Sequence, residues 1–118
     1  MKFAGIEYVG QGDDGGITYV IATGALEGEA VTLTTTATMG RGSDSDVFVG
    51  KLVKKEGDSK GTVVCHGVVV VPAAVGLTAG FKGLQVDGAG KVKAGASNAG
   101  RQALVIGVLD GFAAIDLA

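Results

Sequence analysis

The sequence is poor in the residues that mark disulfide-bonded, metal-binding and sugar-binding proteins. Its 118 residues include one cysteine, one histidine, one proline and no tryptophan. A single cysteine excludes an internal disulfide, and one cysteine with one histidine is too few for a zinc site. The cysteine count fits synthesis in a reducing cytoplasm. The lack of tryptophan argues against an exposed aromatic platform for sugars.

Strong charge and long apolar runs are also absent. The formal net charge is -2, which gives no electrostatic reason to expect nucleic acid as a partner. No apolar stretch is long enough to cross a membrane. The first residues, MKFAGIEYVGQGDD, carry one lysine and soon reach glycine and acids, so we do not expect a signal peptide.

Glycine, valine and threonine dominate what is present. With 22 glycines, the chain favours short strands joined by tight turns. Its length suits one domain with one core. We therefore predict an all-β fold, a small β-barrel or sandwich of about eight to ten short strands, with an N-terminal arm or hairpin.

The valine-rich run Gly61–Ala74, GTVVCHGVVVVPAA, is the most distinctive segment. Valine favours extended backbone, and a continuous apolar run is typical of a strand buried on both faces. We predict that it is the central strand, that Gly67 marks a bulge or corner, and that Pro72 ends it.

Other segments have strand composition and are separated by turn residues. Lys54–Lys60 mixes both signs of charge, as in a solvated hairpin tip, and Asp110-Gly111 predicts a tight turn. The further expected strands are 17–22, 30–38, 47–53, 81–87, 91–94, 103–109 and 112–117. In 30–38 we expect Val31 and Leu33 to face inward and the threonines outward.

The chain contains a faint internal repeat. VFVGKLV, a polar turn and GTVVCHG match ALVIGVL, Asp-Gly and FAAIDLA, with Gly50 and Gly107 in the same place. A strand and a Gly/Ser-containing loop precede each set. This predicts a duplicated half-motif of strand, loop, strand, turn and strand.

The first 27 residues differ from the rest. Three of the six aromatic residues, Phe3, Tyr8 and Tyr19, lie within the first 19 positions. We predict two parts, an N-terminal arm or hairpin over 1–27 and a β-barrel domain over 28–118. Residues 1–27 either form a hairpin on the barrel or leave it to pack on a neighbour.

Few residues suggest chemistry. Cys65 and His66 are adjacent, so on a strand they point to opposite faces and cannot easily share a metal or a proton. Asp44 with Asp46, and Asp13 with Asp14, lack the spacing of a calcium loop. The glycines of 10–15 lack the following helix of a phosphate site. We predict no catalytic, metal or cofactor site and no enzyme.

Residues 28–118 resemble the capsid decoration, or cement, proteins of tailed phages. The matching segments are GEAVTLTTTA, VFVGKLVKKEGDSKGTVVCHGVVVVPA, LTAGFKGLQVDGAGKVKA and ALVIGVLDGFAAIDL. The resemblance implies a structural virion protein, made in the host cytoplasm, that binds the outer surface of the capsid. It would bridge subunits of the major capsid protein without catalysis or cofactor. The oligomeric state stays open, a homotrimer being one option.

Large apolar side chains near the start are the expected anchors to the shell, because aromatic residues give much contact area at little entropic cost. We predict that Phe3, Ile6, Tyr8 and Tyr19 form the capsid interface. The alternatives are a carbohydrate-binding β-module and a small enzyme or carrier domain that uses Cys65.

Overall fold

A computed structural model describes residues 2–3, 6–7, 16–57 and 59–117, with only the backbone described for 2–3, 6–7 and 16. The predicted all-β fold is confirmed: the described chain is made of strands joined by turns, with one short 3₁₀ turn, η2, at Ala96–Asn98. Among the described residues, no helix is long and apolar enough to span a bilayer.

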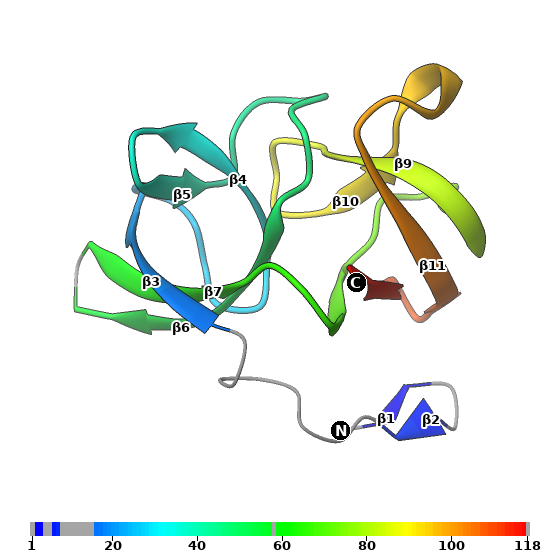
Figure 1. Ribbon diagram of the computed structural model, residues 1–118, viewed down its shortest axis with the longest axis horizontal. Coiled ribbons are helices and arrows are strands. Elements are labelled where there is room, and N and C mark those ends of the chain that lie inside the picture. The colour runs from blue at the N-terminus through cyan, green and yellow to red at the C-terminus, as the bar shows by residue number, and fades with distance from the viewer. Residues whose placement is uncertain (1, 4–5, 8–15, 58, 118) are drawn as a thin grey trace.

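Ten strands form the body of the molecule and two form a small N-terminal pair (Figure 1). The strands are β1 (Lys2–Phe3), β2 (Ile6–Glu7), β3 (Gly16–Ile21), β4 (Ala30–Thr35), β5 (Thr38–Gly40), β6 (Gly50–Glu56), β7 (Lys60–Val64), β8 (Val68–Pro72), β9 (Gly80–Val86), β10 (Val92–Ala94), β11 (Arg101–Leu109) and β12 (Phe112–Asp116).

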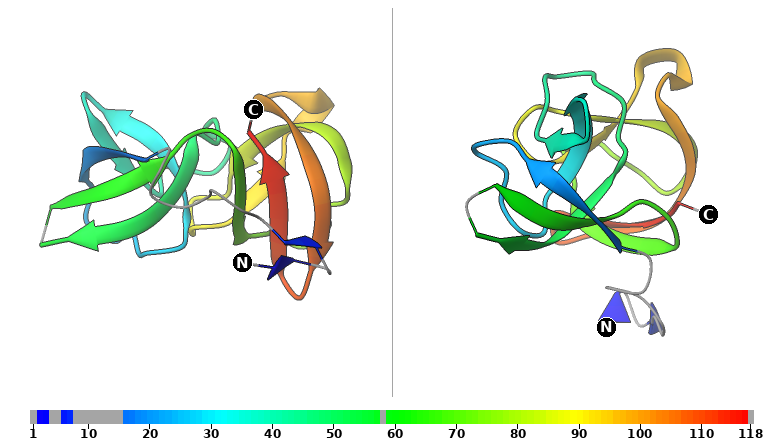
Figure 2. Two further views of the ribbon diagram at one scale, coloured as in Figure 1. Left: turned by 60° about the horizontal axis from the view of Figure 1, so that its bottom comes forward. Right: turned by 60° about the vertical axis from the view of Figure 1, so that its left-hand side comes forward.

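The body consists of two five-stranded units that lie side by side (Figures 1 and 2). The first, which we call the barrel, is closed in the order β3-β5-β4-β6-β7. The second, which we call the open sheet, has the order β10-β9-β11-β12-β8. The chain completes the barrel before it begins the open sheet.

The two units have the same strand connections. In each, the first strand pairs antiparallel with the fifth, the second with the third and the fourth, and the fourth with the fifth. The first strand also runs parallel to the third: β3 to β5 through two residue pairs, and β8 to β10 through a single bridge between Ala73 and Val92. The predicted duplication is therefore confirmed at the level of topology.

Each unit has a β-bulge in its fourth strand, and placing the two bulges at equivalent positions aligns the residues of the two units. One residue is skipped between Leu52 and Lys54 in β6, and one between Val105 and Gly107 in β11. On this alignment Gly107 corresponds to Lys54, so the expected equivalence of Gly50 and Gly107 is wrong. Gly50 lies before its bulge, where a side chain would collide with the backbone of β7.

The valine run does not form one central strand, and that prediction is wrong. Its first half is β7, inside the barrel between β6 and β3, and its second half is β8, at one end of the open sheet. The expected corner is confirmed at Gly67, which has φ 79°, a conformation that glycine adopts at little cost. The run therefore connects the two units.

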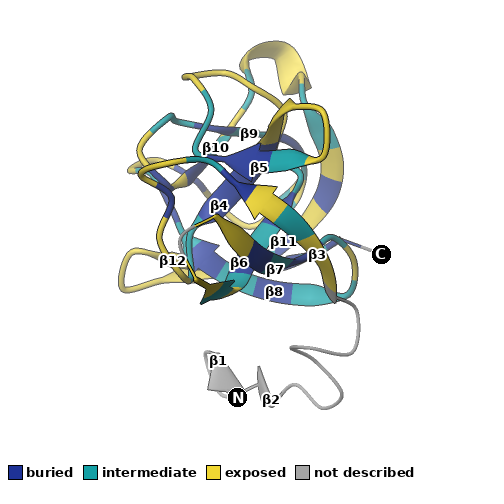
Figure 3. Ribbon diagram, turned by 90° about the vertical axis from the view of Figure 1, so that its left-hand side faces the viewer, coloured by how far each residue is buried: buried dark blue, intermediate teal, exposed yellow. Residues whose placement is uncertain are grey.

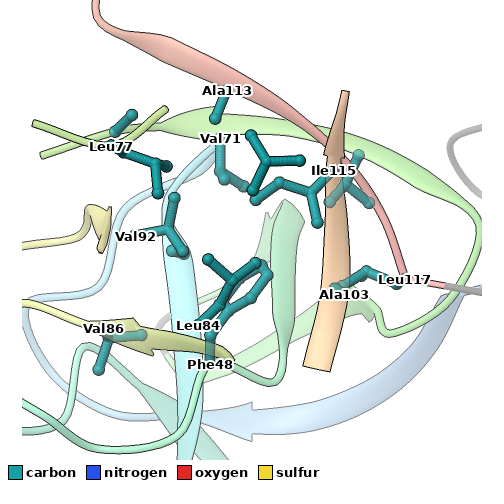
Figure 4. Packing of buried hydrophobic residues seen from close by; sticks show 14 of the residues in the cluster. Phe48, Val71, Leu77, Leu84, Val86, Val92, Ala103, Ala113, Ile115 and Leu117 are labelled. Carbon is teal, nitrogen blue, oxygen red and sulfur yellow. The ribbon is translucent and has the colours of Figure 1, made fainter. Parts of the chain in front are cut away.

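One large core extends through both units (Figure 4). It contains side chains of all five strands of the open sheet and also Ala30 and Val64 from the barrel, with Phe48 fully buried among them. A smaller cluster fills the barrel alone: Ile21, Ala25, Val31, Met39, Leu52 and Val63. Because the larger core takes residues from both units, the two are packed as one body.

The region before residue 28 contributes a strand to the barrel. β3 has β5 on one edge and β7 on the other, so it does not pair with the apolar piece that precedes it. The boundary expected after residue 27 thus falls beyond a strand that completes the barrel. β1 and β2 pair antiparallel with each other, Phe3 opposite Ile6.

Residues 30–38 were expected to be one strand but form a hairpin. Ala37, with φ 53°, turns the chain back from β4 into β5. Val31 is buried as predicted, but Thr32 is also buried and Leu33 is 54% exposed, so the predicted alternation is wrong at these two positions. The pairing of β4 with β6 covers only Ala30 and Val31, and Leu33 lies beyond it.

The predicted turn at Asp110-Gly111 is confirmed. Leu109 pairs with Phe112, and both turn residues have positive φ, 54° and 81°. This is the backbone of a two-residue hairpin that follows the twist of its strands.

Candidate interaction surface

The four residues predicted to dock lie in different surroundings. Phe3 and Ile6 belong to β1 and β2 but their side chains are not described, and Tyr8 lies outside the described residues. Tyr19 is half-buried on β3, packed against the core of the barrel. The structure does not bring these four together into a described surface, and their role stays a prediction.

Tyr19 lies beside Cys65 at the corner that joins the units. Burial raises the pKa of the Cys65 thiol, and neither Arg101 nor the hydrogen bond with Tyr19 offsets this rise. Burial, with the nearby thiol, also raises the pKa of Tyr19. His66 is exposed, while Cys65 is half-buried. A thiol with a raised pKa holds little thiolate at neutral pH and is a poor nucleophile.

Arg101, at the start of β11, holds the same corner together. Its guanidinium donates hydrogen bonds to the carbonyl oxygens of Val49, of Cys65 at 2.7 Å and of Leu117 at 3.2 Å. These three carbonyls lie just before β6, just after β7 and just after β12. One side chain therefore ties segments of both units, which gives Arg101 a structural role.

The acidic loop residues are used within the fold. Asp44 forms an ion pair with Lys93, and the Asp46 carboxylate accepts a hydrogen bond from the Ser43 amide at 2.8 Å. Asp13 and Asp14 lie outside the described residues, as do the glycines of 10–15. Within the described part of the chain, no group of three or more His, Cys, Asp or Glu side chains is placed to hold a metal ion.

Glu29 and Arg41 form a bidentate ion pair near the same loop. The Arg41 Nε donates to Glu29 Oε1 at 2.9 Å and its Nη2 to Oε2 at 2.7 Å, while the Leu26 amide donates to Oε1 at 2.8 Å. Burial alone would raise the pKa of Glu29, but these hydrogen bonds outweigh it and hold the pKa below its usual value. The same pairing raises the pKa of Arg41.

A shallow hollow of about 730 Å³ opens beside Arg41. Its lining is Ala22, Thr23, Thr32, Leu33, Thr34, Arg41, Gly42, Ser43, Asp46, Val47 and Val49. The described lining is mostly polar and contains no aromatic side chain. It offers hydroxyl groups but no flat apolar surface on which a sugar ring could stack.

The outer faces of the two units are the clearest contrast in the molecule. Leu52 and Val63 point into the barrel and their counterparts Val105 and Ile115 point into the larger core. Because side chains alternate along a strand, their neighbours point outward. The matched outward pairs, barrel residue first, are Lys51 and Leu104, Lys54 and Gly107, Glu56 and Leu109, Lys60 and Phe112, and Thr62 and Ala114, of which Ala114 is fully covered.

The first strands follow the same rule. Ile17 lies opposite Val63, and Val69 lies opposite Ile115, the counterpart of Val63. Ile17 in the barrel therefore matches Val69 in the open sheet, and Thr18 matches Val70. Figure 3 shows exposed and half-buried positions along β3, on the outside of the barrel. At most matched outward positions the barrel thus presents threonine, lysine or glutamate where the open sheet presents an apolar side chain or glycine; Val20, which matches Pro72 and is 43% exposed, is an exception.

Six of the outward residues of the open sheet form a surface that we call the apolar face: Val68, Val70, Phe81, Leu104, Leu109 and Phe112. Phe81 lies directly opposite Leu104, and Leu109 directly opposite Phe112. Their exposed fractions are 66%, 43%, 48% and 47% in that order. The half-buried Asp116 lies in the same row as Leu104 and Val68.

Sequence reasoning did not identify the apolar face. ALVIGVL was recognised as a strand, but its local sequence does not show which side of it is covered. The available signal was the comparison of the two hairpins: aligned at their bulges, one carries charges at its outward positions and the other does not.

Comparison with known proteins gave no match for this chain. No protein-family model matches it, and no curated protein matches it either. The sequence resemblance and the geometry of the molecule are therefore the basis on which its function is inferred.

Proposed function

We propose that this protein is a structural virion protein that binds the outer surface of a phage capsid and stabilises it by bridging capsid subunits. The observation that carries the proposal is the larger core, which takes side chains from both five-stranded units. A molecule that must hold two neighbouring subunits at a fixed spacing needs two ends that do not move relative to each other, and a shared core supplies this.

The four segments that resemble decoration proteins support the proposal. They coincide with the framework strands of both units: β4, the run from β6 to β8, β9 with β10, and the β11–β12 hairpin. The resemblance thus extends over strands of both units and not over one hairpin, although β3 and β5 lie outside it.

Bridging strengthens attachment even when each contact is modest. A standard contact covers about 800 Å² on each partner. Once one end is bound, the second binds at a high effective concentration, so two contacts hold far more tightly than one. In this proposal the protein needs no catalysis and no cofactor, its partner is the major capsid protein, and it resides on the outside of the virion.

Removal of residues 1–15 tests the predicted anchors. We expect the shortened protein to keep the fold of the body, because β3 begins at Gly16, and to bind expanded capsids at least ten-fold more weakly. Binding is measured by co-sedimentation with purified expanded capsids. The matched control is Val75→Ser, which changes a fully exposed apolar residue of the β8–β9 turn and should leave binding unchanged. Undiminished binding after the deletion would exclude the N-terminal anchors.

The two alternatives have less support. The hollow lacks the aromatic surface that a sugar-binding module uses. A Cys65-dependent enzyme or carrier needs a reactive thiol, whereas burial raises the pKa of this one. A glycan array with clear hits, or rapid alkylation of Cys65 in the folded protein, would favour these alternatives over capsid binding.

A further inference from the structure

We propose that the apolar face is the surface through which one copy of this protein associates with another. The inference goes beyond capsid binding and does not depend on it. It starts from the contrast between the units: the same strand connections carry charges outward in the barrel and apolar side chains outward in the open sheet.

The exposed apolar area of this face is close to the apolar area that one partner contributes to a stable interface. Phe81, Leu104, Leu109 and Phe112 together leave on the order of 400 Å² of apolar surface exposed. A standard interface covers about 800 Å² per partner, and a little over half of that is apolar. The four side chains therefore supply the apolar part of one such contact, and half-buried Val68 and Val70 continue it.

A second copy is the occupant that this chemistry fits. The four exposed side chains are uncharged, and the half-buried Asp116 is the one acid in the row of Leu104 and Val68, so two copies of the face bring few like charges together. The matching surface of the barrel carries Lys51, Lys54 and Lys60 with one acid, Glu56, so two copies of it would bring mostly like charges together. A second copy is also available as soon as the chain has folded. The net charge of -2 gives little electrostatic repulsion between two copies, so their apolar faces can approach each other.

The copies meet through the face and not through the edge of the sheet. The Ala73 amide bonds to Gly111 and the Leu117 amide to Gly67, so the peptide groups of Val68 and Val70 point away from β12, along the free edge of β8. That edge ends in Pro72, which has no N–H to donate, and β10 already bridges Ala73. A strand of another copy would find few partners there.

The test exchanges residues between the two units of the same chain. In the variant Leu104→Lys, Leu109→Glu, Phe112→Lys, the open sheet receives the residues that the barrel carries at the matched positions. We expect the natural protein to have a multiple of its 11.6 kDa chain mass by light scattering, and this variant to have the mass of one chain. Circular dichroism checks that the β content is kept.

Two further variants secure the result. Leu104→Lys alone leaves the β11–β12 turn untouched, and we expect it to shift the association to higher concentration by at least ten-fold. Ile17→Ser, Val20→Lys changes two exposed apolar residues of the barrel and should leave the mass unchanged. The inference is overturned if the natural protein is a single chain at all concentrations, or if the triple variant keeps the mass of an assembly. It is also overturned if self-association appears only after residues 1–15 are removed, because that result would make the chain's own first residues the occupant.

Discussion

The barrel and the open sheet share one set of strand connections but meet solvent in different ways. The barrel is closed by two parallel residue pairs between β3 and β5, filled by its own small core and charged outside. The open sheet is bridged once between β8 and β10, shares the larger core and is apolar outside. The same topology thus serves as a solvated unit in one half and as a contact unit in the other.

The comparison also shows that the units are unequal in independence. The barrel has a core of its own, whereas the core of the open sheet includes Phe48, which precedes β6, together with Ala30 and Val64 of the barrel. The open sheet therefore depends on the barrel for part of its interior. Three substitutions, from the largest expected effect to the smallest, test this dependence and the difference in charge.

Phe48→Ala should have the largest effect. Removing a fully buried phenylalanine typically lowers the free energy of unfolding by about 4 kcal/mol. Because its core spans both units, we expect the amides of β7 and β12 to lose protection from hydrogen exchange together, in one transition. Phe48→Leu, which keeps most of the volume, should cost about 1 kcal/mol. Separate transitions for β7 and β12 would show that the units unfold independently.

Arg101→Met should follow. It leaves the carbonyls of Val49, Cys65 and Leu117 without their charged donor, and we expect a loss of about 3 kcal/mol, measured by denaturant unfolding. Gln102→Met changes the exposed neighbour and should stay within about 0.5 kcal/mol of the natural protein. If both variants behave alike, Arg101 does not hold the units together.

Glu29→Gln should have the smallest effect, about 1 kcal/mol at neutral pH, because it removes the charge of one ion pair at the side of the barrel that meets the β9–β10 turn. The folded-state pKa of Glu29 lies below its usual value, so the stabilisation is present above the carboxyl pKa of the unfolded chain and is lost as pH falls through the folded-state pKa. The natural protein and the variant should therefore converge in acid.

The readout for Glu29 is the denaturant midpoint measured from neutral to acid pH. The exposed Glu56 of the β6–β7 hairpin provides the control, because Glu56→Gln makes the same substitution away from the ion pair. A stability difference between Glu29→Gln and the natural protein that stays constant across this range would contradict the role assigned to the ion pair.

The sequence predicted the elements better than their grouping. Strands and turns with clear local chemistry were found, such as the hairpin around Asp110-Gly111 and the corner at Gly67. The assignment of the valine run failed because its two halves have the same composition. Local sequence could mark the turn between them but not which sheet each half joins.

Burial on β4 and the apolar face were missed for a related reason. Alternation placed Leu33 inside, but whether an inward position is covered depends on how far the neighbouring strand extends, and the pairing with β6 covers only Ala30 and Val31. Likewise, the outward side of β11 could be recognised as apolar surface only when its partner strands and its counterpart β6 were known. These are properties of the assembled sheet.

The short passage through Cys65, His66 and Gly67 suggests a history for the molecule. Each half of the chain holds a full set of five strands, and the interior of one half takes side chains from the other. A gene of half this length could have encoded a five-stranded chain that formed a dimer. Such a dimer would already have had these strand connections in each chain and a core shared between the two chains. Duplication and fusion of such a gene would need only a three-residue joint between the end of one copy and the start of the next.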